Sequence, residues 1–207
     1  REDLANIKVD NASEFKNSHH AWSKQNEISL KEVTFTYPGK ENPALENISL
    51  KIKPNTIVGF VGTSGSGKST LADVIIGLIK PQQGEVTIDG TPLIKQNLRE
   101  WQNKIGFVPQ TIFLTEGTIA ENVAFGIPQD LINYRQVEQA LKLAHLEEFV
   151  SKLENGIYSK VGERGVQLSG GQRQRVGIAR TLYYEAEVLV FDEATSALDG
   201  ITEKTIM

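Results

Sequence analysis

The sequence predicts an α/β fold, on three observations. Short apolar runs typical of strands alternate along the chain with segments of helical composition. A glycine-rich loop at 62–67 separates an apolar run from a helical segment, which is half of a strand–helix–strand unit. Residues 188–191, Val-Leu-Val-Phe, form the unbroken apolar run expected of a parallel strand that is buried on both faces. The 207 residues leave room for one domain with an inserted subdomain.

Composition and charge exclude several classes of protein. Hydrophobic residues at 39% and charged residues at 23% are close to globular averages, so the chain can bury a core. The net charge of −4 lacks the basic excess of a general nucleic-acid binder, and we expect no nucleic-acid partner. Because the chain has no cysteine, disulfides, thiolate metal sites and cysteine nucleophiles are excluded.

The hydrophobic pattern predicts the elements in order. Residues 1–26 are polar and weakly patterned, as in a linker, and the folded domain is expected over 27–207. Apolar and polar side chains alternate over 28–37, with a slip of phase at Lys31-Glu32, and a second strand over 44–52 would complete an antiparallel β subdomain. Beyond it, we expect a helix at 69–79 and strands at 56–61, 85–89, 105–108 and 188–191.

The stretch from about 115 to 185 is predicted to be an inserted helical subdomain. Apolar residues recur there at the spacing of one helix face in two successive runs: Val137, Ala140, Leu141, Ala144, and then Leu146, Phe149, Val150, Leu153. The pattern indicates two amphipathic helices in sequence.

Residues 62–69 match the phosphate-loop pattern G-x-x-x-x-G-K-S, after a predicted strand and at the start of a predicted helix. Glycines let successive backbone N–H groups surround an anion, and the helix N-terminus adds partial positive charge. Lys68 would reach the β and γ phosphates of a nucleotide, and the Ser69 hydroxyl would bind Mg²⁺. The predicted phosphate-binding residues are Gly62, Thr63, Ser64, Gly65, Ser66, Gly67, Lys68, Ser69 and Thr70.

Two carboxylates follow the apolar run at 188–191, and open α/β sheets place their ligands at such strand ends. Adjacent strand residues point to opposite sides, so one carboxylate can face a metal while the other faces an attacking water. We assign Asp192 to Mg²⁺ and Glu193 to general-base catalysis. The alternative is a solvated strand end with two ordinary acids.

Leu168-Ser-Gly-Gly-Gln172 has two compatible interpretations. Ser169 and Gln172 have the spacing of a capping box, which would start a helix. Gly170 and Gly171 would expose backbone N–H groups at that helix start, which makes a second anion site. A chain with one phosphate loop has little use for a second site unless two copies meet across one nucleotide.

The order of these motifs resembles the nucleotide-binding domain of ABC transporters. The matching segments are the phosphate loop, Gln110 after a strand, LSGGQ at 168–172, VLVFDE at 188–193 and Ser196-Ala-Leu-Asp199. The resemblance implies a P-loop NTPase fold with a RecA-like parallel core, binding ATP and Mg²⁺.

The same resemblance implies roles for individual residues. Tyr37 would stack on adenine, and Gln110 would sense the γ-phosphate and the metal. LSGGQ would close over the ATP held by a second domain, and Asp199 would lie at the dimer interface. The catalytic set would then be Glu193, Lys68 and Gln110.

Two segments resemble exporter-type domains in particular, namely 113–123 and Gly162-Glu-Arg-Gly165. This resemblance implies an ATPase motor of an exporter or flippase at the cytoplasmic face of the cell membrane, pairing with an identical domain and joined to a transmembrane domain on the same polypeptide. A weaker similarity points to flippases of lipid-linked oligosaccharides. The family's switch histidine and last strands have no match, so we expect a C-terminal truncation.

Two other functions compete with this one. A soluble ABC ATPase of DNA repair or translation would share the motifs, but the acidic composition and the exporter-like segments disfavour it. A nucleotide-gated dimerisation module that never hydrolyses ATP would be expected to lose one of Lys68, Asp192, Glu193 or LSGGQ, and all four are present.

Overall fold

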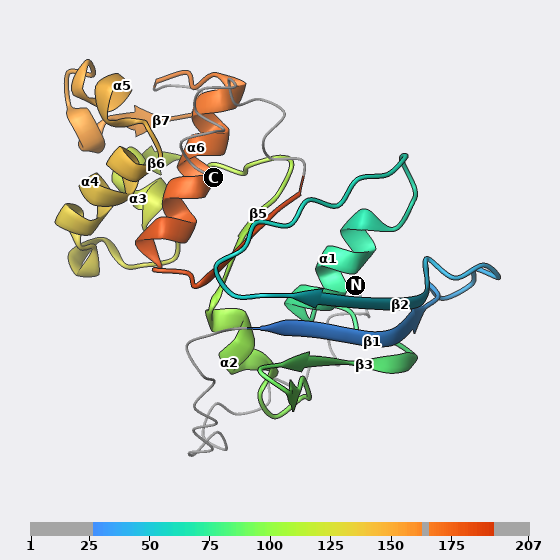
Figure 1. Ribbon diagram of the computed structural model, residues 1–207. Helices are drawn as coiled ribbons and strands as arrows, with labels where there is room; N and C mark the ends of the chain where they lie inside the picture. The colour runs from blue at the N-terminus through green and yellow to red at the C-terminus, as the bar shows by residue number, and fades with distance from the viewer. Residues whose placement is uncertain (1–26, 163–165, 193–207) are drawn as a thin grey trace, which may run out of the picture.

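The computed structural model describes residues 27–162 and 166–192 (Figure 1). Its strands are β1 (Ile28–Phe35), β2 (Leu45–Ile52), β3 (Gln83–Ile88), β4 (Thr91–Pro92), β5 (Ile105–Val108), β6 (Gly117–Thr118), β7 (Lys160–Val161) and β8 (Val188–Phe191). Its helices are α1 (Lys68–Ile76), α2 (Leu98–Asn103), α3 (Ile119–Val123), α4 (Tyr134–Leu143), α5 (Glu147–Ser151) and α6 (Gly170–Tyr183), with 3-10 turns η1 (Gln129–Leu131) and η2 (Gly156–Tyr158).

An antiparallel sheet with strand order β2-β1-β3-β4 opens the fold. The slip of phase predicted in its first strand is a β-bulge: Glu32 has a φ of 51°, and the pairing of β1 with both neighbours shifts register there. The bulge returns Val33 to the same face as Ile28 and Leu30, and all three are buried. The predicted hairpin of 28–37 and 44–52 is confirmed.

Helices α1 and α2 pack on the apolar face of this sheet. Val74 and Ile75 of α1 share a buried cluster with strand residues of β1 and β3. Trp101 of α2, fully buried, closes the cluster and donates its indole N–H to the backbone carbonyl oxygen of Ile75 at 2.8 Å. The indole of Trp101 is buried with its one polar group hydrogen-bonded. This contact fixes α1, the helix that follows the phosphate loop.

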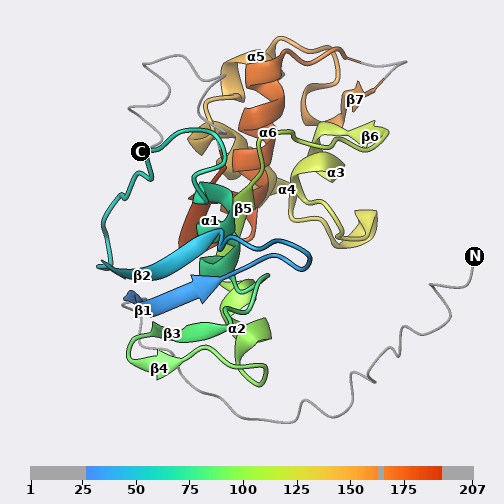
Figure 2. The same ribbon diagram turned by 90° about the vertical axis from the view of Figure 1, so that its right-hand side faces the viewer.

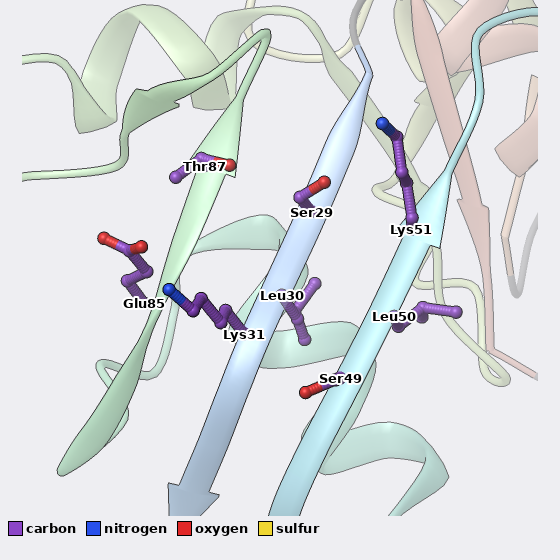
Figure 3. A pocket seen from close by; sticks show the side chains of 8 residues that line it. All are labelled: Ser29, Leu30, Lys31, Ser49, Leu50, Lys51, Glu85 and Thr87. Carbon is purple, nitrogen blue, oxygen red and sulfur yellow. The ribbon is translucent and has the colours of Figure 1, made fainter.

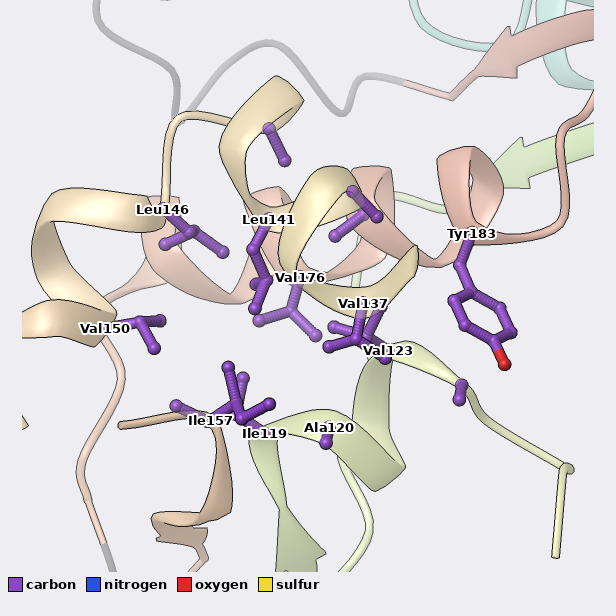
Figure 4. Close-up of a cluster of buried hydrophobic side chains, with 14 of the residues drawn as sticks. Ile119, Ala120, Val123, Val137, Leu141, Leu146, Val150, Ile157, Val176 and Tyr183 are labelled. Atoms are coloured by element: carbon purple, nitrogen blue, oxygen red, sulfur yellow. The ribbon is translucent and has the colours of Figure 1, made fainter. Parts of the chain in front are cut away.

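A second core lies among α3, α4, α5 and α6 (Figure 4). Val176, Ile178 and Ala179 of α6 are buried against the other three helices. The two predicted amphipathic helices are present as α4 and α5, although α5 already ends at Ser151. Helix α2 and the short strand pair β6–β7 were not predicted, because six and two residues carry too little periodicity to detect.

The parallel strands β5 and β8 connect the two cores (Figures 1 and 2). Their first residues, Ile105 and Val188, pack against the cluster under the antiparallel sheet. Their last residues, Val108 and Phe191, pack in or against the helical cluster. The carboxyl ends of both strands thus lie beside the helical part of the molecule.

Two expectations about strands are wrong. Residues 56–61 form no strand, and Ile57, Val58 and Val61 are 68%, 42% and 99% exposed. An apolar run becomes a strand only where its backbone groups find a partner, and no described strand pairs with this one. β8 pairs with β5 alone among the described strands, and Leu189 is 37% exposed, so the expected burial on both faces is not observed.

No helix within 27–162 or 166–192 combines the length and the apolar character needed to cross a membrane. The predicted linker at 1–26 lies outside the described residues.

Candidate functional site

The loop at 62–67 leads directly into α1, and its last residue must be glycine. Gly67 precedes the helix with a φ of 87°, and a Cβ at this position would collide with the backbone carbonyl oxygen of Ala44. The backbone N–H of Ser66 donates to the carbonyl oxygen of Thr63 at 3.2 Å, which closes the loop into a turn. The chain therefore enters the N-terminus of a nine-residue helix through a tight turn that ends in glycine, and a helix N-terminus is a place where anions bind.

Lys68 folds back over this loop. Its Nζ donates hydrogen bonds to the carbonyl oxygens of Gly62 and Thr63, both at 3.0 Å. The ammonium group is thus held on the loop by weak, neutral acceptors, and a phosphate oxygen is a stronger partner for it.

Ser69 and Asp192 are 123 residues apart in sequence and meet at the start of α1. The Ser69 hydroxyl donates to Asp192 Oδ1 at 3.2 Å. The backbone N–H of Asp192 donates to the carbonyl oxygen of Val108, so the end of β8 is fixed against the end of β5. A hydroxyl and a carboxylate oxygen side by side form the kind of hard-oxygen donor set that suits Mg²⁺, and these residues fit the predicted metal.

Asp73 adds a second carboxylate near the Ser69–Asp192 pair. Burial, and then the negative charge of Asp192, raise the pKa of Asp73 above its ordinary value. Asp73 was not among the predicted site residues. The signal that could have revealed it is its position four residues after Ser69 on one helix.

Gln110 follows the end of β5 by two residues, as Asp192 follows the end of β8 by one. Since β5 and β8 are parallel with Val108 opposite Phe191, both side chains belong to the same edge of the sheet. Gln110 is exposed.

Tyr37 lies just beyond β1 and is tied to the phosphate-loop helix. Its hydroxyl shares a 3.1 Å hydrogen bond with the hydroxyl of Thr70, and its ring meets Phe35 edge to face at 4.9 Å. Tyr37 as a whole remains 40% exposed. An exposed aromatic face near the loop is what stacking on a base needs.

The capping box predicted at 168–172 is confirmed. Ser169 Oγ accepts from the backbone N–H of Gln172 at 3.2 Å, and Gln172 Oε1 accepts from the backbone N–H of Ser169 at 2.8 Å. Ser169 and Gly170 are exposed at the start of α6. Within the described ranges, no hydrogen bond or ion pair joins this segment to the phosphate loop of the same chain.

Glu193 and Asp199, assigned above to the general base and the dimer interface, lie outside the described residues.

A buried polar network beside α6 was missed by the sequence analysis. Asn122 is 1% exposed and its amide group donates to the backbone carbonyl oxygens of Thr115 and Thr118, both at 3.0 Å. Arg180 of α6 donates to the backbone carbonyl oxygen of Asn122 and so belongs to the same network. A readable signal was the capping-box spacing Thr118-x-x-Glu121, which the structure forms.

A hollow of about 440 Å³ lies elsewhere, on the solvent face of the antiparallel sheet (Figure 3). It is lined by alternate polar residues of β1, β2 and β3, including Ser29, Lys51 and Thr87. None of the predicted site residues lines it. This is the ordinary polar face of a half-buried sheet, so we do not assign it to the site.

Comparison with known proteins identifies similar domains. The model of a family described as "ABC transporter" matches residues 45–196. The chain is 42% identical over 180 residues to the ATP-dependent lipid A-core flippase of Escherichia coli K12, and equally to that of Shigella flexneri. A bacterial Atm1-family ABC exporter, solved with ATP bound, superposes with a TM-score of 0.77 at 36% identity and covers 88% of this chain.

The match covers 87% of this chain but only 31% of each flippase, and 32% of the exporter chain. The chain therefore spans about a third of the length of these relatives.

Proposed function

The chain belongs to the ABC transporter family, and we propose that it is the ATP-binding and ATP-hydrolysing motor domain of an exporter or flippase. The observation that carries the proposal is the meeting of Ser69 and Asp192 beside the loop that holds Lys68. An ammonium and a hydroxyl from adjacent residues thus lie near a carboxylate from 123 residues away, and these are groups that a nucleotide and its metal need. The similarity to a flippase and to an exporter supports transport over the soluble ATPases of DNA repair or translation.

The phosphate loop would hold the nucleotide. Backbone N–H groups of 62–67 and of Ser69 and Thr70 would donate to the phosphate oxygens. Lys68 would exchange its bonds to the carbonyl oxygens of Gly62 and Thr63 for the β and γ phosphates. Tyr37 would stack on the adenine, oriented by its bond to Thr70.

Ser69, Asp192 and Gln110 would hold Mg²⁺ together with the phosphates. When bound, the ion neutralises charge on the β and γ phosphates. The chain's contribution is to fix oxygen donors from α1 and from the ends of β5 and β8 on one side of the nucleotide. Glu193, the residue after Asp192, would accept the proton of the attacking water.

The LSGGQ segment at 168–172, called here the signature segment, would act on a second copy of the domain. Ser169 and Gly170 are exposed at the N-terminus of the fourteen-residue helix α6, where partial positive charge suits a γ-phosphate. In the part described, no hydrogen bond or ion pair joins this segment to the chain's own phosphate loop, as action in trans requires. We expect a homodimer with ATP between Lys68 of one chain and Ser169–Gln172 of the other, and Asp199 at the interface.

Exporter-type relatives suggest the remaining partner. A transmembrane domain on the same polypeptide would precede the described part, with residues 1–26 as the connection. The motor would then work at the cytoplasmic face of the cell membrane.

Nucleotide binding tests the proposal first. With a fluorescent ATP analogue and Mg²⁺, we expect Lys68→Ala to weaken binding at least about tenfold, since a charge-assisted bond to phosphate is lost. Lys95→Ala removes an exposed lysine far along the sequence from every motif and serves as the control. Equal affinities of wild type and Lys68→Ala would show that Lys68 does not bind the phosphates. A chain that is extended through the missing C-terminal strands, binds ATP and does not hydrolyse it would favour the non-hydrolysing module.

A further inference from the structure

Three oxygen-bearing side chains gather on one side of α1. Ser69 and Asp73 are four residues apart within the helix and so lie on the same face, about one turn from each other. Asp192 reaches that face from β8 and accepts the hydrogen bond of the Ser69 hydroxyl at 3.2 Å. Its negative charge acts on the Asp73 carboxyl. Asp73 therefore belongs to the surroundings of the Ser69–Asp192 pair.

The position of Asp73 is fixed by the helix end. Its backbone carbonyl oxygen accepts from the N–H groups of Leu78 at 2.8 Å and Ile79 at 3.3 Å. Gly77, with a φ of 80°, turns the chain back so that these bonds can form. These bonds engage the backbone alone, and they fix the place of Asp73 at the end of α1.

The surroundings of the Asp73 carboxylate are unfavourable for its charge. It is half-buried, and both burial and the Asp192 charge oppose ionisation. Neither cause is a cation. Two carboxylates held near each other repel, and a divalent cation between or beside them removes the repulsion. Such a pair of carboxylates destabilises the site when it is empty and strengthens the binding of a cation when one is present.

We propose that Asp73 is a positioning residue of the magnesium site, where its charge raises the affinity of the nucleotide-loaded site for a divalent cation. The proposal rests on the proposed function, which supplies the nucleotide and the metal. Asp73 is not proposed as a ligand of the metal. Ser69 and Asp192 supply the ligand oxygens, and the negative charge of Asp73 acts on the cation electrostatically.

The proposal predicts two effects of opposite sign. Without a divalent cation, the Asp73 charge repels the nucleotide phosphates, so Asp73→Asn should bind ATP more tightly in the presence of EDTA. With nucleotide bound, the same variant should need more divalent cation to fill the site. One unit charge nearby changes such equilibria by about three- to tenfold. Loss of a merely structural residue would weaken both equilibria together.

The experiment compares four proteins: wild type, Asp73→Asn, Asp73→Glu and Asp130→Asn. Fluorescent ATP analogue is titrated in EDTA, and Mn²⁺ binding is then followed by electron paramagnetic resonance at saturating nucleotide. We expect Asp73→Asn to raise ATP affinity in EDTA and to raise the Mn²⁺ half-saturation concentration about three- to tenfold. Asp73→Glu keeps the charge and should stay near wild type, and Asp130, exposed on η1, is the matched control.

The outcomes separate the two proposals. An Mn²⁺ half-saturation in Asp73→Asn equal to that of a wild type that binds nucleotide and Mn²⁺ overturns the role of Asp73 alone. Parallel weakening of both equilibria also overturns it, because it indicates a structural role. A wild type that binds no nucleotide overturns the proposed function, and with it this inference. Thermal unfolding of each variant shows whether it is folded under the binding conditions.

Discussion

Arg180 donates a 2.6 Å hydrogen bond from its Nε to the backbone carbonyl oxygen of Asn122, so a half-buried charge joins α6 to the end of α3. A second bond reaches Asn122 Oδ1 at 3.2 Å, and the guanidinium lies over the Phe125 ring at 4.9 Å. Burial lowers the pKa of Arg180, which nevertheless stays charged at neutral pH because an arginine pKa begins so high. The helix that starts at the signature segment is thereby fixed to the exporter-like segment 113–123.

Replacing Arg180 by alanine should destabilise the protein. The change removes the Arg180 donor from the buried backbone carbonyl oxygen of Asn122, whereas Asn122 Oδ1 keeps the backbone N–H of Thr115 at 2.9 Å. We expect the free energy of unfolding to fall by about 1–3 kcal/mol. Arg173→Ala, which removes an exposed arginine from the same helix, should change it by less than about 0.5 kcal/mol. Urea denaturation followed by circular dichroism measures both, and equal effects would show that the Arg180–Asn122 bonds contribute nothing.

Glu193→Gln should separate binding from hydrolysis. The carboxamide keeps the shape of the side chain and removes the proposed base, so ATP binding should persist while turnover drops at least about a hundredfold. Sedimentation with ATP and Mg²⁺ should then show a trapped dimer. Glu154→Gln, at an exposed position far along the chain, is the control. A hydrolysis rate that Glu193→Gln leaves unchanged would assign the base to another residue.

Ser169→Asp distinguishes capping from phosphate binding. Aspartate caps a helix as well as serine and suits its positive end, so the melting temperature of the monomer and its own ATP affinity should change little. If the helix start faces the γ-phosphate of a second copy, the added charge should abolish the ATP-dependent dimer, as should Gly171→Glu. A Ser169→Asp protein that dimerises normally would leave Ser169 as a cap only.

A mixture of variants tests the sharing of sites directly. A dimer of one Ser169→Asp chain and one Lys68→Ala chain contains one composite site with an intact phosphate loop and an intact signature segment. We therefore expect the mixture to recover part of the dimer or of the hydrolysis that neither parent shows. A mixture as inert as both parents, with both chains folded, would argue against head-to-tail pairing.

Asp73 makes stability depend on pH. Its pKa is raised in the folded protein, so folding favours the protonated carboxyl: this contribution is present below the ordinary pKa and is lost as the pH rises through the folded-state pKa. At pH 7 the ionised group therefore destabilises the metal-free protein. Asp73→Asn should raise the melting temperature there by about 1–2 °C, and the gain should shrink as the pH is lowered toward about 4. Differential scanning calorimetry in EDTA measures this, with Asp130→Asn as control, and a gain independent of pH would exclude the charge as its cause.

The sequence predicted features correctly where interactions between residues close in sequence decide the structure. The capping box of Ser169 and Gln172 depends on residues three apart, and it formed as predicted. The strand at 105–108 matches the structure to the residue, because Lys104 before it and Pro109 after it leave little choice of where the strand begins and ends. The slip at Lys31-Glu32 in the alternation of β1 likewise marked its bulge in advance.

The pairing of strands and the burial of their side chains could not be predicted in the same way. The run at 56–61 has the composition of a strand and is exposed, because composition does not supply a hydrogen-bonding partner. β8 is apolar throughout and only half-buried among the described residues, since composition does not supply the elements that would cover its two faces.

By itself the sequence determined the family of this protein: the loop at 62–69, the carboxylates at 192 and 193, and LSGGQ at 168–172 resemble the ABC nucleotide-binding domain, and the family model matches residues 45–196. Only the tertiary structure decided which of these groups meet. It joined Ser69 to Asp192 across 123 residues, brought the charge of Asp192 to bear on Asp73, and buried Arg180 on Asn122. The physical reason is that motif chemistry is local to a few residues, whereas desolvation and charge interaction depend on which distant segments pack together.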